Sequence, residues 1–263
     1  MTFPPPRMRR VSIVLACLSF ILVPLLAHAS HSWGGYHWAR TANPFTLKLG
    51  DNLSSPWDSY LGTTSTDWSA STVLDTSIVA GQGGKKCRAS AGRVEVCNDR
   101  YGRNGWLGIA QIWINGSHIT QGLAKMNDSY FNSAPYNTFA WKNLVMCQEV
   151  AHTFGLDHQD ETFNNTNLGT CMDYTNDPDG TIYNQLSNEQ PNAHDFAELG
   201  IIYAHLDSST TLSTGVPGSN GQDVEDAKDW GKVVKKDAKG KPSLYEKDLG
   251  KGDKIYTHVL WAE

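Results

Sequence analysis

Residues 147–160 read CQEVAHTFGLDHQD, and this stretch decides how the rest of the chain is interpreted. The apolar residues of 140–154, AWKNLVMCQEVAHTF, recur at helical spacing and predict a helix with one buried face. Gly155 follows directly, and a glycine at that place ends a helix and lets the chain turn sharply.

The polar side chains of this stretch have the spacing of a metal site. Gln148 and His152 lie one helical turn apart and project from the same face, with Glu149 beside them. His158 comes after the turn and can return to the same point. Two donors on a rigid helix, a third from the turn and one open position are what a catalytic zinc ion needs.

The run E-V-A-H-T-F-G-L-D-H at 149–158 resembles the motif H-E-x-x-H-x-x-G-x-x-H of the metzincin zinc endopeptidases. Further along, TCMDY at 170–174 is similar to the Met-turn of astacins and serralysins. The resemblance covers roughly residues 45–206 and implies a zinc metalloendopeptidase. It implies an α/β (α+β) fold, a metzincin-like zincin domain with a twisted mixed sheet, an active-site helix and a closing helix over 194–205.

The resemblance also assigns roles to single residues. His152 and His158 are expected to bind zinc, and Glu149 is expected to be the general base that takes a proton from a metal-activated water. Met172 would form an apolar floor under the metal. Tyr174 would bind the metal or stabilise the transition state.

Gln148 stands where the family has its first histidine. A neutral amide oxygen is a poorer zinc ligand than an imidazole nitrogen, and two interpretations stay open. In one, Gln148 binds zinc weakly through its carbonyl oxygen, or Tyr174 supplies the missing contact, and the enzyme works. In the other, the protein is a catalytically inactive, protease-fold binding module that is secreted.

Charge and strand pattern limit the partners. Arg7, Arg9 and Arg10 belong to a predicted leader peptide that is described below. Without them the chain has 19 basic and 27 acidic side chains, and this net charge of −8 disfavours nucleic acid or an anionic membrane as a partner. We expect a monomer that acts on a peptide or protein substrate, laid along an edge strand around 107–126. Residues 176–180, NDPDG, offer oxygen ligands for calcium, but D-P-D-G is first of all a turn.

The first residues predict export. Arg7, Arg9 and Arg10 precede an apolar run that ends in Ala27-His28-Ala29, the pattern of a signal peptide over 1–29. A cleaved leader implies a secreted, extracellular protein.

Four cysteines remain after the leader: Cys87, Cys97, Cys147 and Cys171. An even number suits an oxidising compartment, and four cysteines allow three pairings. We favour the disulfides Cys87–Cys97 and Cys147–Cys171 because both close short loops. The segment 87–99 is expected to be a hairpin stapled by its own cysteines.

Composition divides the mature chain into parts. We expect a metallopeptidase domain over 30–207, a linker over 208–222 that is rich in serine, threonine and glycine, and a small β-rich extension over 223–263. His31 and His37, in the first segment of the mature chain, have no role that the sequence explains.

Overall fold

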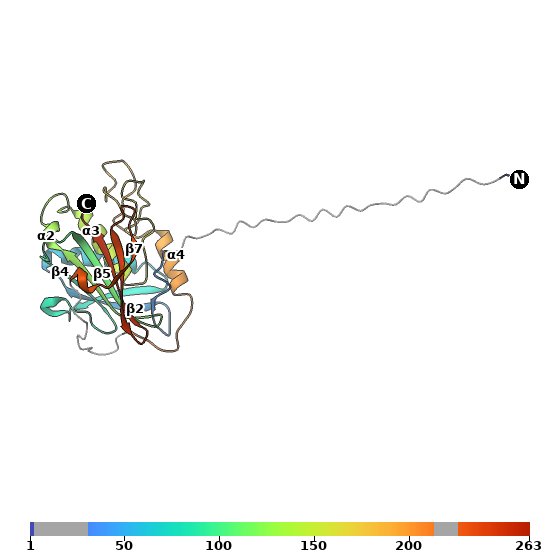
Figure 1. Cartoon of the computed structure of the whole chain (residues 1–263), viewed down its shortest axis with the longest axis horizontal. Coiled ribbons are helices and arrows are strands. Elements are labelled where there is room, and N and C mark those ends of the chain that lie inside the picture. The colour runs from blue at the N-terminus through green and yellow to red at the C-terminus, as the bar shows by residue number, and fades with distance from the viewer. Residues whose placement is uncertain (3–30, 213–225) are drawn as a thin grey trace.

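The computed structural model describes residues 1–2, 31–212 and 226–263. The predicted signal peptide, and most of the predicted linker, lie outside these residues. The described chain is a mixed α/β structure in which one large sheet is accompanied by a few helices (Figure 1).

The sheet has nine strands, in the order β3-β2-β4-β6-β5-β9-β8-β7, with β1 paired to β6 beside that path. One half, from β3 to β6, is parallel, whereas β6, β5, β9, β8 and β7 pair antiparallel. The strands are β1 His37–Trp38, β2 Phe45–Asn52, β3 Leu74–Ala80, β4 Val94–Asp99, β5 Trp106–Asn115, β6 His118–Asn127, β7 Lys232–Lys236, β8 Pro242–Gly250 and β9 Asp253–Trp261.

Helices cover one face of the sheet. The α-helices are α1 Asp58–Trp68, α2 Asp128–Phe131, α3 Phe139–His152 and α4 Ala193–Ile202, and the 3₁₀ turns are η1 Ser55–Trp57, η2 Gly84–Lys86 and η3 Ala227–Asp229. The long helix α3 packs on α1 and on β5, β6 and β9. Thr138 caps its first turn by accepting a hydrogen bond from the Trp141 amide, and helix and turn meet where the sequence predicts them.

Buried residues form two apolar clusters, one on each face of the sheet. The larger lies on the α3 side and the smaller on the opposite side. Side chains of β9 point alternately to the two faces, as the two-residue period of a strand requires. Tyr256 and Leu260 belong to the cluster on the α3 side, and Ile255 and Val259 belong to the cluster on the opposite side. This alternation directs His258 towards α3.

The C-terminal strands continue the main sheet. β9 pairs with β5 from Trp106 to Asn115, and β8 and β7 follow outward. The strands β7, β8 and β9 of residues 226–263 therefore belong to the same sheet as the strands of 31–207. The expectation that strand 107–126 offers a free edge is wrong, because β5 already has a partner on both sides.

The cysteine-rich segment also differs from its prediction. Val94–Asp99 is not one arm of a local hairpin but a parallel strand between β2 and β6. The structure joins Cys87 to Cys97 and Cys147 to Cys171, the two pairs that loop length favours. The second disulfide ties α3 to the segment that carries Met172. Both bonds are compatible with an extracellular protein.

Across the described segments, no helix is long and apolar enough to cross a membrane.

Gly155 is the backbone position on which the turn after α3 depends. Its φ is +100°, and a Cβ there would lie 2.2 Å from the carbonyl oxygen of Tyr36. We expect Gly155→Ala to lower the free energy of unfolding by about 2–4 kcal/mol, because both the backbone angle and the contact are unfavourable.

Gly200, in the middle of α4, is the matched control, since a Cβ there meets nothing within 4 Å. Gly200→Ala should raise stability by about 0.4–1 kcal/mol. Urea unfolding followed by circular dichroism measures both. Equal effects of the two substitutions would refute the assigned role of Gly155.

Candidate metal centre

Two histidines meet at the end of α3. His152 is the last residue of the helix, and His158 returns after the turn at Gly155. Their Nε2 atoms are 3.0 Å apart, and the rings are perpendicular within 7°. Two nitrogens bound to one tetrahedral zinc lie about 3.3 Å apart, so this spacing suits a shared metal ion.

The outer nitrogen of each ring is held by the protein. Nδ1 of His152 faces the carbonyl oxygen of Leu156 at 2.8 Å, and Nδ1 of His158 faces a carboxylate oxygen of Glu161 at 2.8 Å. An Nδ1–H donor in each case leaves Nε2 with its lone pair free. Such outer hydrogen bonds fix the tautomer and orientation of metal-binding histidines.

A third histidine, His258 of β9, completes the group. Its ring stacks on His152 at 3.9 Å and lies at 4.4 Å from the ring of His158. One ring nitrogen from each of the three histidines lies within 4.8 Å of the others, and all three side chains are buried. Nδ1 of His258 has no hydrogen-bond partner among the described residues. Three imidazoles with such a free nitrogen form a donor set that fits zinc.

Sequence reasoning did not select His258. Alternation along KIYTHVLWA could have placed it on one face with Tyr256 and Leu260, but no local signal says which strand β9 joins. The pairing of Ala110 with His258 across β5 and β9 is what brings it to α3.

Gln148 is buried one turn before His152. Its Nε2 donates to the carbonyl oxygen of Cys171 at 2.8 Å, whereas its Oε1 has no partner among the described residues. The amide is thus held by the Met-turn segment through its nitrogen, and its oxygen is the atom that could face a metal.

Glu149 is fully buried, and neither of its carboxylate oxygens has a hydrogen-bond partner in the described part of the chain. Burial raises its pKa well above the ordinary value for glutamate. Gly108 of β5 makes room for this side chain: a Cβ at Gly108 would lie 2.4 Å from Oε1. An unpaired buried carboxyl on the helix that also carries His152 is typical of a site that works on a bound group.

Met172 and Tyr174 are buried in the same cluster as α3. The ring of Tyr174 lies 4.3 Å from that of His158, and its hydroxyl has no partner among the described residues. Burial, with the negative charges of Glu161 and Glu149 next in weight, raises the Tyr174 pKa well above its ordinary value. The hydroxyl therefore stays protonated and able to donate.

Charged side chains close the site from the C-terminal strands. Lys235 of β7 lies 2.8 Å from Asp157 and 3.1 Å from Glu161. Burial alone would raise the pKa of Glu161, but its hydrogen bond with His158 and the nearby positive charges lower the pKa to about 2. Burial lowers the pKa of His258 to about 4, which keeps that imidazole neutral at pH 7.

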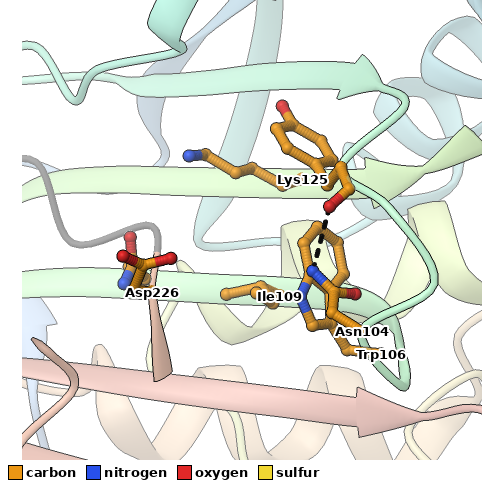
Figure 2. A pocket seen from close by; sticks show the side chains of 7 residues that line it. Asn104, Trp106, Ile109, Lys125 and Asp226 are labelled. Carbon is orange, nitrogen blue, oxygen red and sulfur yellow. Dashed lines mark hydrogen bonds between the residues drawn. The ribbon is translucent and has the colours of Figure 1, made fainter. Parts of the chain in front are cut away.

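The pocket in Figure 2 lies elsewhere on the sheet. It is lined by seven residues: Tyr101, Asn104, Trp106, Ile109, Gln111, Lys125 and Asp226. Ile109 belongs to the cluster on the face opposite α3, so this pocket does not open onto the histidines.

The 176–180 loop forms the turn that D-P-D-G predicts. The amide of Gly180 donates to the carbonyl oxygen of Asp177 at 3.0 Å, and Asp179 accepts from Thr181. A calcium site is not supported.

Comparison with solved structures gives distant likenesses, of which one is described here. The fold resembles High choriolytic enzyme 1 (HCE-1), a hatching enzyme zinc-protease from Oryzias latipes (Medaka fish), at 9% sequence identity and a TM-score of 0.37. The match covers 65% of this chain and 96% of that one. No family model and no curated protein matches the sequence. The chemistry of the site therefore rests on the residues of this chain.

The buried Glu149 generates a prediction for the metal-free protein. Because its pKa is raised in the folded state, the folded protein holds a proton that the unfolded chain releases, and stability falls as pH rises above the ordinary glutamate pKa. Glu149→Gln removes this penalty. The stability gain over wild type should grow between pH 5 and pH 8, by up to about 1.4 kcal/mol per pH unit.

Urea unfolding of both proteins at several pH values, with a chelator present, measures that difference. Subtracting the two curves removes the contributions of the other titrating groups. A difference that is independent of pH would contradict the buried, unpaired state of Glu149.

Proposed function

We propose that this chain is a secreted zinc-dependent metallopeptidase of the zincin kind, in which His152, His158 and His258 hold the metal. The observation that carries the proposal is the convergence of three buried imidazoles at the end of the helix that also carries Glu149, a buried carboxyl without a partner among the described residues. Neutral histidines bind zinc, and an unpaired carboxyl next to them can act as a base.

The residues have separate tasks in peptide hydrolysis. Zinc, when bound, would polarise the scissile carbonyl and lower the pKa of water at the site. Glu149 accepts the proton of the attacking water and passes it to the leaving amine. Tyr174 donates a hydrogen bond to the oxygen on which negative charge develops. The Glu161 carboxylate and the Leu156 carbonyl keep the rings of His158 and His152 oriented.

Access to this site requires movement. The three histidines, Glu149 and Tyr174 are buried, and β9 covers β5 along its length. A peptide substrate can reach Glu149 only after some of the surrounding residues have moved while β9 keeps His258 at the metal.

The same covering favours a second candidate function, a zinc-stabilised binding module without catalysis. If the residues that cover the site never move, the metal would join α3 to the C-terminal strands and serve stability alone. Zinc content together with proteolysis separates the two functions.

The deciding experiment uses purified full-length protein, analysed for zinc and for casein hydrolysis with and without chelator. We expect bound zinc and chelator-sensitive hydrolysis. Glu149→Gln should keep its zinc and lose at least about a hundredfold in activity, the usual weight of a general base. Zinc without hydrolysis would support the binding module, and a protein that takes up no zinc at this site would refute both.

A second experiment identifies the third ligand. His258→Ala should weaken zinc binding by at least about a hundredfold, because an imidazole donor is lost. Gln148→Leu is the matched control and should leave the affinity nearly unchanged. The double variant Gln148→His/His258→Ala should recover much of the loss, since a new imidazole then stands one turn before His152.

Zinc titration into metal-stripped proteins measures all three affinities. If Gln148→Leu weakens binding and His258→Ala does not, the amide oxygen of Gln148 is the third donor and the role of His258 is wrong.

A further inference from the structure

A second group of metal-binding side chains lies apart from α3. His37 belongs to β1 and His118 to the start of β6, where they are register partners in a parallel pair. His205 and Asp207 follow α4. Three segments far apart in the sequence therefore meet at one end of the β5–β6 hairpin.

One ligand atom each from His37, His118 and Asp207 lies within 4.8 Å of the others, and His205 lies beside this group. The Nε2 atoms of His118, His37 and His205 lie 3.1, 3.5 and 3.7 Å from one oxygen of Asp207, its Oδ1. Nε2 of His205 is 3.0 Å from Nε2 of His37. These separations bracket the value of about 3.3 Å expected between ligands of one tetrahedral zinc.

The protein orients these atoms through contacts on their outer sides. Nδ1 of His37 lies 2.9 Å from the carbonyl oxygen of Gly35, so it carries the proton and leaves Nε2 with a free lone pair. The other oxygen of Asp207, Oδ2, accepts from the backbone amide of Arg40 at 3.1 Å and from its guanidinium at 2.9 Å. Arg40 is itself buried and packs on Tyr203, which fixes the carboxylate.

A metal ion would replace contacts that these side chains make with one another. Nε2 of His37 is within hydrogen-bond distance of Nε2 of His205 and of Oδ1 of Asp207, and such groups bind zinc once it displaces their protons. His118 and His205 are 36% and 53% exposed at their side chains, so a metal ion can enter from solvent.

We propose that His37, His118, His205 and Asp207 bind a second zinc ion, which joins β1 to the segment after α4. His37, His118 and Asp207 are the grouped donors, and the half-exposed His205 would turn towards the ion to complete the four positions of a structural, tetrahedral site. The site does not depend on the peptidase function, because it shares no residue with His152, His158 or His258.

The test compares metal-stripped full-length wild type with His118→Gln/His205→Gln, two substitutions at partly exposed positions that should preserve the fold. The control is His194→Gln, which alters a histidine outside both groups. Zinc bound per chain is measured by elemental analysis after dialysis, thermal unfolding is followed with and without zinc, and cobalt is added as a spectroscopic probe of tetrahedral geometry.

We expect the double variant to bind about one zinc fewer per chain than wild type and the control, whether or not His152, His158 and His258 bind zinc. In a background of His152→Gln/His158→Gln, zinc at a hundredfold excess over Kd should still raise the melting temperature by about 5–10 °C. The His118→Gln/His205→Gln changes should abolish this rise and the cobalt absorption of that background.

Two results would overturn the proposal. One is an unchanged zinc content in His118→Gln/His205→Gln, with its folded state verified by circular dichroism. The other is a His152→Gln/His158→Gln protein that binds neither zinc nor cobalt, which would show that these side chains contact one another without holding a metal ion. Failure of the peptidase proposal looks different, since it leaves one zinc that depends on His118 and His205.

Discussion

The pairing of β9 with β5 is the interaction on which the site depends. It turns the C-terminal strands into part of the main sheet and, through the two-residue period of a strand, aims His258 at the end of α3. The same pairing takes up the backbone groups on that edge of β5. One set of hydrogen bonds thus brings a third imidazole to the site and helps to bury it.

Burial gives this arrangement its chemical character. Three imidazoles and the Glu149 carboxyl are removed from water, and burial disfavours the charged form of each group whose pKa shift is resolved. A divalent cation would instead favour the charged form of Glu149, and it would bind the imidazoles in their neutral form. The acidic pair Asp157 and Glu161, with Lys235 across from it, adds a charged layer around the histidines and couples it to the C-terminal strands.

Residues 31–40 contact both histidine groups. The backbone amide of Trp33 donates to the carbonyl oxygen of Gly155 at 3.0 Å, and its indole donates to Leu156, so Trp33 holds the turn that carries His158. A few residues later, His37 enters the second group. Residues 31–40, which composition leaves without a role, are therefore the part of the chain that spans the two sites.

The sequence by itself determined the local features of this protein. Helical spacing before Gly155 predicts α3, and the spacing of His152 and His158 predicts that they meet. Each depends on residues close in the chain, where periodicity and turn chemistry act. Tertiary structure alone decided the partners of β4 and β9, and with them the position of His258. It also decided the assembly of His37, His118 and Asp207. Strand pairing between distant segments is set by packing and burial over the whole sheet, and no local pattern encodes it.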